Sequence, residues 1–545
     1  MPEKIALYFS PLQQTFADLC TTIDRQDWLH LDQRETACCW RGTNLTLCLH
    51  LARTIEEVQK LMRSTYYSAI LVDCRHLADY LEAAPKQEKA LEDFFNLLGT
   101  ETDRERRYPF RRVAVLVGDA DRERVDKLIF RLGQRHIGAC LRDRSLNDGL
   151  HGEQDVAASD RLIEQLWQFC SEILVDRPKG KKAFNLAGGG ISGIYYELGV
   201  LKCLNDAFSG LDVRDFDMYF GIGAGAFVGS FAANGFHVDK LIATIGDIKR
   251  KWPYSLRLRM RHLNLREIPK RMNALRRNTV KHLGDLVSRQ EDLSVASLLD
   301  NYALSLGPLF SHNELERALR EQFDTVKHTN DFRKLPRKLF VGVTDQDRRE
   351  HVLLGDDGYD DVPISLAVQA STAIHPFFQA VPIHGRYYAD GAITRTSNIT
   401  ASIAKGADLI FVIDPFVPLI SDEAGFNIKH SNLWIQQQDI KTLAYTRFAQ
   451  MSEEILRQNP QVSCYTFVPS NRMRALMTQS PLSVDNFHPI ITEAYAGTYR
   501  RLTQLEYKIA GELAEHGIQL ELKPVAARVE ELSRSRKPDA NILIK

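Results

Sequence analysis

The sequence lacks several features that would assign it to a special class. No apolar stretch approaches the roughly 20 residues that a membrane-spanning helix needs, and no signal peptide follows the N-terminal methionine. Internal repeats and low-complexity tracts are also missing. The 70 basic and 70 acidic side chains balance, so net charge favours no particular partner. These absences predict a globular cytoplasmic protein, and 545 residues leave room for two or three domains.

Cysteine pairs with metal-binding spacing are absent as well. The nine cysteines are scattered singly apart from Cys38-Cys39, and none forms a C-x-x-C motif. An odd number without a motif is typical of reduced thiols in a cytoplasm and not of a disulfide framework. We therefore expect no metal site and no cofactor.

One catalytic motif is present except for its reactive residue. The segment Gly221-Ile222-Gly223-Ala224-Gly225 lies between a strand candidate, 216–220, and the start of a buried helix, 226–233. A G-x-S-x-G turn needs small flanking residues, which Gly221 and Gly225 supply, and it exposes a central serine as nucleophile. Gly223 holds that central position, and no segment of the chain satisfies G-x-S-x-G. Glycine here is consistent with a natural replacement or with one introduced by design.

A glycine-rich loop precedes this turn. Gly188-Gly189-Gly190-Ile191-Ser192-Gly193 follows a strand candidate, 183–187, and opens a helical stretch. Backbone N–H groups that converge at a helix N-terminus can stabilise a developing oxyanion. The same glycines could mark a dinucleotide-binding loop, but the acidic residue expected at the end of a second strand is not evident.

Two later segments complete a collinear pattern. They are Ser371-Thr372-Ala373-Ile374-His375-Pro376-Phe377-Phe378 and Asp390-Gly391-Ala392, and a core strand candidate, 339–345, precedes both. In this order the motifs resemble those of patatin-like phospholipases. The resemblance implies a three-layer α/β/α domain over 180–525, with 188–193 as the oxyanion loop, Asp390 as the partner of the nucleophile, and an acyl lipid or phospholipid as ligand.

Two departures from the family pattern affect the chemistry. Gly223 replaces the nucleophilic serine, and Ser192 stands where the family usually has Lys or Arg. We therefore expect a catalytically impaired lipid-binding or regulatory protein. The alternative is an active acyl hydrolase that uses Asp390 with an activated water or with another nucleophile. Ser192, which we expect to cap the following helix, and Ser371 and Thr372 are the nearby hydroxyl groups. His375 is interpreted as a packing residue.

Residues 1–150 predict a separate open α/β domain, because strand candidates alternate with amphipathic helices. The expected strands are 4–9, 45–49, 68–72, 112–117 and 137–141, and the expected helices are 11–22, 54–63 and 121–133. The alternation resembles a response-regulator receiver with Asp73 at the phosphoacceptor position. The acidic pair that would hold Mg²⁺ is missing, Gly118 replaces a Ser or Thr, and Arg142 replaces a Lys. A degenerate receiver that serves homodimerisation or docks a signalling partner fits better, and Asp73 is expected to be structural.

Three further segments have distinct compositions. Residues 151–179 predict a helical linker, and residues 526–545 a charged tail. The stretch 249–281 carries twelve basic residues and one acidic residue, with apolar side chains interleaved. Such a segment could lie on an anionic membrane surface at the inner face of the membrane, contact a protein or act as plain scaffold; nucleic acid is the least expected partner. A membrane-surface scaffold for signalling is therefore a third functional alternative.

Overall fold

The computed structural model of the chain separates into two compact units. Unit 1 comprises Met1–Gly180, Leu456–Ser463 and Leu502–Leu520, and unit 2 comprises Lys181–Ile455, Cys464–Arg501 and Glu521–Lys545. The structure describes residues 3–26, 30–34, 37–42, 45–75, 94, 112–118, 122–134, 137, 139–143, 153–174, 179–246, 273, 276, 277, 280, 312–375, 377–459, 461–478 and 486–544. Nearly all of the basic segment 249–281 therefore lies outside the described residues.

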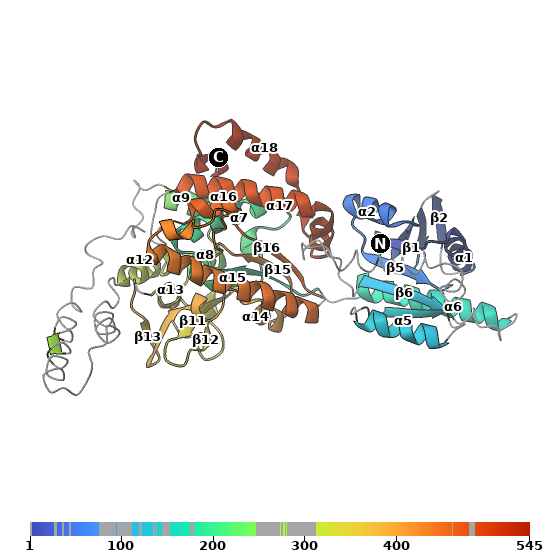
Figure 1. Ribbon diagram of the computed structural model, residues 1–545, viewed down its shortest axis with the longest axis horizontal. Helices are drawn as coiled ribbons and strands as arrows, with labels where there is room; N and C mark the ends of the chain where they lie inside the picture. The colour runs from blue at the N-terminus through green and yellow to red at the C-terminus, as the bar shows by residue number, and fades with distance from the viewer. Residues whose placement is uncertain are drawn as a thin grey trace. The chain divides into compact units, whose positions relative to one another are not determined.

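Unit 1 contains a seven-stranded sheet in the order β2-β3-β4-β1-β5-β6-β7 (Figure 1). Its strands are β1 (Glu3–Phe9), β2 (His30–Arg34), β3 (Ala37–Arg41), β4 (Thr46–Ala52), β5 (Ala69–Cys74), β6 (Val113–Gly118) and β7 (Ala139–Asp143). The five strands β4-β1-β5-β6-β7 are parallel and follow the order 2-1-3-4-5, which is one of the two common doubly wound orders. The predicted open α/β sheet is confirmed, and the receiver-like interpretation stays a prediction.

Helices cover both faces of this sheet because alternate strand residues point to opposite sides. The helices are α1 (Gln13–Asp24), α2 (Ile55–Ser64), α5 (Arg122–Gln134) and α6 (Glu153–Leu174). Ala6 and Tyr8 of β1 pack in one core with apolar residues of α1 and α6. Leu7 and Phe9 pack in the other core with residues of α2 and α5.

Helix α6 was expected to be a linker, but in the structure it belongs to unit 1. Leu162, Ile163 and Leu166 are each 1% exposed and join the core that includes Tyr8 and Trp40. The sequence showed the apolar period of this helix correctly. It gave no information about which surface that apolar face would cover.

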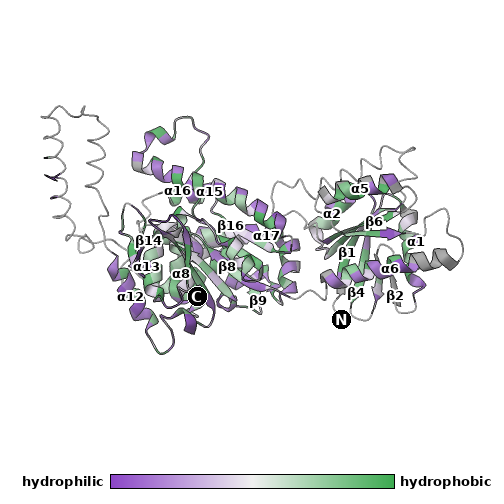
Figure 2. Ribbon diagram, turned by 90° about the horizontal axis from the view of Figure 1, so that it is seen from below, coloured by the Kyte–Doolittle hydropathy of each residue, from purple (hydrophilic) through white to green (hydrophobic). Residues whose placement is uncertain are grey.

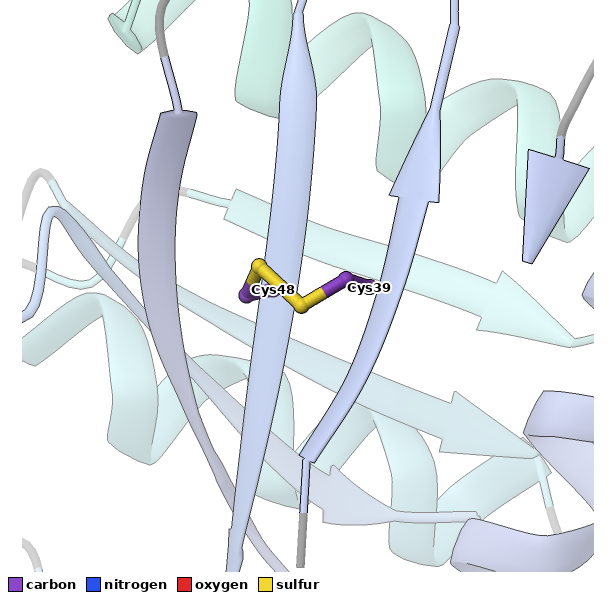
Figure 3. The surroundings of a disulfide bond; sticks show 2 residues. All are labelled: Cys39 and Cys48. Carbon is purple, nitrogen blue, oxygen red and sulfur yellow. A yellow bond between two sulfur atoms is a disulfide. The ribbon is translucent and has the colours of Figure 1, made fainter. Parts of the chain in front are cut away.

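The hairpin β2–β3 was not predicted from the sequence, and its pairing with β4 brings two cysteines together. Strand β3 pairs antiparallel with β4, which places Cys39 directly opposite Cys48. The two residues form a disulfide bond, shown in Figure 3. The expectation that all thiols are reduced is wrong for this pair, because cross-strand register, which spacing along the chain does not reveal, brings them together.

Unit 2 is built on a larger mixed sheet in the order β13-β14-β11-β10-β8-β15-β16, with β12 paired to β11. Its strands are β8 (Lys181–Leu186), β10 (Met218–Ile222), β11 (Lys338–Asp345), β12 (His351–Leu354), β13 (Val381–Ile383), β14 (Arg386–Asp390), β15 (Ala407–Ile413) and β16 (Ser463–Phe467). Strands β15, β8, β10 and β11 are parallel, whereas β14 runs antiparallel to β11. The central strands are almost wholly buried, as is usual for a sheet covered on both faces.

Helices flank this sheet on both sides (Figure 1). They are α7 (Gly190–Ala207), α8 (Ala224–Ala233), α9 (Val238–Gly246), α12 (Asn313–Phe323), α13 (Ile364–Ser371), α14 (Ile399–Ala404), α15 (Asn432–Gln458), α16 (Asn471–Leu476), α17 (Phe487–Glu515) and α18 (Leu522–Arg534). The C-terminal ends of α15, from Leu456, and of α17, from Leu502, are assigned to unit 1. Every residue of α8 is buried, and Figure 2 shows this helix mainly in hydrophobic colours. A helix that is apolar all round must lie inside the unit, which fixes the position of the turn that precedes it.

The C-terminal segment expected to be a charged tail is ordered. Helix α18 continues to Arg534, and the short 3-10 helix Ala540–Ile544 buries Ala540, Ile542 and Leu543. The tail was predicted from its many charged residues, and that prediction did not take these three apolar side chains into account. None of the helices in the described part of the chain is long and apolar enough to cross a membrane.

The cross-strand disulfide can be tested by counting thiols. The nine cysteines less the two in the bridge leave seven, so the denatured protein should titrate seven thiols before reduction and nine after it. The Cys39→Ser variant should titrate the same number under both conditions. Nine thiols without a reductant would show that β3 and β4 carry free cysteines.

Candidate active site

The ends of neighbouring strands bring the three sequence motifs of unit 2 together. Strands β8 and β10 run parallel, with Leu186 opposite Gly221, so the turns that follow them lie side by side. Strand β11 is the next neighbour of β10, and β14 pairs with β11 so that Asp390 faces Val343. Sites in open α/β sheets form at the carboxyl ends of the parallel strands, and these motifs meet there.

Gly223 forms the turn between β10 and α8. Its backbone has φ 56° and ψ −114°, which lies outside the regions that residues with a Cβ adopt without strain. A sharp strand-to-helix turn of this kind is the geometry of a nucleophile elbow. The turn therefore has the conformation of the motif although the residue in it is glycine.

The neighbouring glycines are required by close contacts. A Cβ added to Gly225 would lie 2.1 Å from the carbonyl oxygen of Leu186, and one added to Gly221 would lie 2.5 Å from the Cα of Ala226. Both distances are far below van der Waals contact. The packing of the turn therefore leaves no room for a side chain at either position.

A buried serine holds the turn in place. The N–H of Gly223 donates to Ser371 Oγ over 2.9 Å, and this hydroxyl donates to the carbonyl of Gly342 over 2.7 Å. Ser371 is fully buried, so its hydroxyl is committed to two backbone partners. The neighbouring Thr372 donates to the carbonyl of Val368 over 2.8 Å. These contacts show that Ser371 and Thr372 stabilise the local backbone. Pro376 of the same segment lies outside the described residues.

The glycine loop opens α7 at Gly190, where the first N–H groups of the helix have no carbonyl partner inside it. A Cβ on Gly189 would lie 2.7 Å from Pro415 Cγ, so the loop packs closely on the segment after β15. Ser192 was expected to cap this helix, but it lies inside the first turn and donates to the carbonyl of Gly189 over 3.3 Å. Ile191 points inward and is 8% exposed.

Gly223 faces both other motifs. A Cβ added to it would lie 3.4 Å from the Cα of Gly188 and 3.6 Å from each carboxylate oxygen of Asp390. Among the described residues, apart from the chain neighbours of Gly223, these are the three nearest atoms, and the distances are ordinary contacts. A small side chain at position 223 would therefore start between the glycine loop and the carboxyl group. The structure brings Gly188, Gly223 and Asp390 together as the sequence order suggested.

Asp390 has a buried carboxyl group that accepts one hydrogen bond from the described residues. It is 7% exposed, and its Oδ1 accepts from the N–H of Ala392 over 2.9 Å. Burial raises the pKa of Asp390 to about 7, although the hydrogen bond from Ala392 lowers it. The residue between Asp390 and Ala392 must be glycine, because a Cβ at position 391 would lie 2.4 Å from the carbonyl oxygen of Gly342. The carboxyl group is thus partly protonated near neutral pH.

A series of hydrogen-bonded side chains behind Asp390 was not predicted from the sequence. Thr344 donates to the carbonyl of Asp390 over 2.9 Å, and its hydroxyl lies 2.9 Å from that of Thr394. Thr394 lies 2.9 Å from His351 Nδ1, and His351 Nε2 lies 2.9 Å from Asn398 Oδ1. Burial lowers the pKa of His351 to about 4, so the ring is neutral. No local motif marks His351, since its partners come from distant parts of the chain.

The histidine singled out in the sequence lies apart from this chain. His375 is half-buried, and burial together with the positive charge of Arg349 lowers its pKa. Among the described residues it makes no hydrogen bond to Asp390. Groups of three or more His, Cys, Asp or Glu side chains that could hold a metal ion are also absent from the described residues.

The second candidate residue, Asp73 in unit 1, is fully engaged by its neighbours. Arg75 binds its two oxygens over 3.0 and 3.1 Å and also reaches Asp143 over 3.0 Å. The hydroxyl of Tyr8 donates to Asp73 as well. Burial alone would raise the pKa of Asp73, but the charge and hydrogen bonds of Arg75 outweigh it and the pKa is lowered. The guanidinium of Arg75 thus binds both carboxylate oxygens of Asp73, which is consistent with a structural role for Asp73.

A strained strand-to-helix turn beside a glycine loop and a buried acid is the layout of an α/β acyl-hydrolase site. Residues 185–404 match the family model of the patatin-like phospholipases, and this part of the chain carries a patatin-like phospholipase domain. That family acts on lipid substrates, and the match supports a lipid acyl-hydrolase scaffold in this part of the chain. The glycine loop, Gly223 and Asp390 all lie within the matched range.

More distant comparisons add little. The solved structure of VipD from Legionella pneumophila is 14% identical, with 65% of this chain and 75% of that chain covered and a TM-score of 0.28. At that level the similarity supports no statement about the fold or the activity. A search of curated proteins finds no match.

The buried acid makes stability depend on pH. Asp390→Asn should raise the free energy of unfolding at pH 8 by about 2–4 kcal/mol, because the folded state then no longer buries an ionised carboxylate. The pKa rises from 3.8 to about 7 on folding, so the native protein loses stability as pH rises through this window. The difference in free energy of unfolding between Asp390→Asn and the unmodified protein should be small at pH 4 and constant above pH 7. Denaturant unfolding at several pH values would measure it.

Asp345→Asn is the matched control. Its carboxylate pairs with Arg386, and the hydrogen bond from that guanidinium holds the pKa of Asp345 well below its usual range. This variant should lose stability at neutral pH. Equal destabilisation by both variants at pH 8 would contradict the assignment of Asp390 as a desolvated acid.

The Asp73 cluster supports unit 1. Arg75→Met should destabilise the protein by about 3–5 kcal/mol, because it leaves two buried carboxylates without their cation. Arg142→Met removes the exposed ion pair with Asp126 and should change stability by less than about 1 kcal/mol. Thermal unfolding of the full chain would measure both effects, and equal midpoints for the two variants would refute the structural role.

Proposed function

We propose that unit 2 binds acyl lipids and that its hydrolytic activity is strongly impaired. The observation that carries this proposal is the position of Gly223, whose missing side chain would lie 3.6 Å from both oxygens of Asp390. The turn, the glycine loop and the acid keep the geometry of the scaffold. The reactive atom is missing, and Ser192 stands where the family usually has Lys or Arg.

The chemical argument concerns the attacking oxygen. In a Ser–Asp dyad the carboxylate takes the hydroxyl proton while the serine oxygen attacks the ester carbonyl. The N–H groups at the start of α7 would then stabilise the oxyanion. Without a nucleophile, serine hydrolases retain only about 10³–10⁴-fold catalysis over water, from substrate binding and the oxyanion hole. We expect similarly weak activity from this protein.

A second candidate is a slow hydrolase in which Asp390 activates water. Its pKa of about 7 favours this alternative, because a base poised near neutral pH is suited to proton transfer. The space beside Gly223 would hold the attacking water. Such activity should increase as pH rises through 7 and disappear in Asp390→Asn.

The remaining alternatives have less support. Ser192 as a nucleophile would first have to release the carbonyl of Gly189, to which its hydroxyl donates. The membrane-surface scaffold depends on the basic segment 249–281, nearly all of which lies outside the described residues. Vesicle sedimentation that persists after deletion of this segment would argue against the scaffold alternative.

Restoring serine tests the main proposal. Gly223→Ser should increase hydrolysis of a medium-chain fluorogenic ester by at least about 100-fold, because the new oxygen starts within reach of Asp390. The increase should vanish in Gly223→Ser/Asp390→Asn. A side chain at φ 56° costs on the order of 1–3 kcal/mol, so thermal unfolding should confirm that the variant is folded.

Gly223→Ala is the matched control, since it has the same backbone strain and the same added Cβ without the hydroxyl. It should remain as inactive as the unmodified protein. Strong Asp390-dependent hydrolysis by the unmodified protein would overturn the proposal in favour of the water mechanism. A folded but inactive Gly223→Ser variant would show that the oxyanion loop is also defective.

A further inference from the structure

A cavity lies next to the candidate active site, between α15 and the segment that follows Asp390. The cavity has a volume of about 80 Å³ and is partly open to solvent. It is lined by Thr394, Arg395, Thr396, Ser397, Ile399, Thr400, Arg447, Phe448, Met451, Ser452 and Ile455. This volume is smaller than the range of about 300–1,000 Å³ that is common for sites enclosing a whole small molecule, so the cavity can enclose only a head group and the first part of a chain. Helix α15 lies beyond residues 185–404, so the family match does not assign a role to this cavity.

Two arginines line the cavity without acidic partners. The guanidinium of Arg395 makes no hydrogen bond or ion pair with the described residues. Arg447 donates only to the carbonyls of Ala392 and Ile393, each over 3.4 Å. No Asp or Glu is among the lining residues. Burial is the largest cause of the lowered pKa of His351, and the positive charges of both arginines lower it further.

The cavity also has hydroxyl groups and an apolar wall. Ser397 Oγ is buried and has no hydrogen-bond partner within the described part of the chain. The apolar wall is formed by Ile399, Phe448, Met451 and Ile455. Met451 is 49% exposed and lies at the solvent side of this wall. A ligand that fits must therefore combine an anionic head with an aliphatic chain.

We propose that this cavity binds a single-chain anionic amphiphile, with its carboxylate or phosphate between Arg395 and Arg447 and its chain along Phe448 and Met451. Arginine pairs bind carboxylates and phosphates through charge-assisted hydrogen bonds, and Ser397 can donate a further one. The apolar wall would bury the first part of the chain. Both head groups share this chemistry, and a carboxylate and a phosphate probe can distinguish them.

The proposal goes beyond the acyl-lipid scaffold and does not need Gly223 chemistry. The cavity adjoins the segment after Asp390 through Thr394 and through Arg447, which donates to the carbonyls of Ala392 and Ile393. Binding can therefore be measured in the unmodified protein whether or not it hydrolyses esters. A negative result in the binding test would not change the interpretation of the Gly223→Ser experiment. A negative result with Gly223→Ser would likewise not change the interpretation of the binding test.

Titration calorimetry on the full-length protein provides the test. Decanoate and decyl phosphate are the anionic probes, decyl maltoside is the neutral probe of equal chain length, and acetate is the probe without a chain. We expect one molecule of decanoate or decyl phosphate per chain and at least tenfold weaker binding of decyl maltoside and acetate. Tighter binding of one anionic probe identifies the preferred head group.

Two variants locate the binding site. Arg395→Gln removes one charge without touching the carbonyls held by Arg447, and Met451→Glu places a negative charge at the mouth of the cavity. Each should weaken decanoate binding at least tenfold. Leu443→Glu is the matched control, because Leu443 is 72% exposed on the same helix but does not line the cavity. It should leave binding unchanged.

Several results would overturn the proposal. These are no binding of either anionic probe, equal affinity for decyl maltoside, or unchanged decanoate affinity in folded Arg395→Gln and Met451→Glu proteins. Equal weakening by Leu443→Glu would also overturn it, because it would indicate a nonspecific charge effect along α15. Unchanged melting temperatures of the variants establish that a loss of binding is local.

Discussion

The candidate site depends on one buried hydroxyl group. Ser371 accepts the N–H of Gly223 and donates to the carbonyl of Gly342, and so it connects the turn after β10 to the neighbouring strand β11. This connection offsets the cost of a backbone conformation that few residues adopt. Because β14 pairs with β11, the same strand also positions Asp390. The turn and the acid are thus held by one shared element.

The cost of this arrangement appears at Asp390. A carboxyl group buried with one hydrogen bond has its pKa raised to about 7, and the chain of Thr344, Thr394 and His351 fixes its backbone without neutralising its charge. Functional sites commonly keep such destabilised acids. In this protein the acid is preserved although the residue that it would activate is missing. That combination favours a retained binding scaffold.

The sequence predicted the parts of the structure that local contacts decide. Strand and helix positions in both units agreed with apolar periodicity, and the glycines at 221 and 225 were explained by close backbone approach. Contacts between distant segments could not be predicted in this way. Ser371 reaches Gly223 across 148 residues, and the pairing of Cys39 with Cys48 depends on the register of an unpredicted hairpin.

The central claim is that glycine at position 223 removes the nucleophile from a site in which the turn and the buried acid remain in place. Intact-protein mass spectrometry after treatment with a fluorophosphonate probe tests this claim most directly, because the probe forms a covalent adduct only with an activated hydroxyl group. We expect a single adduct on Gly223→Ser, mapped to residue 223, and none on the unmodified protein or on Gly223→Ala. A stoichiometric adduct on the unmodified protein would contradict the claim and identify another nucleophile.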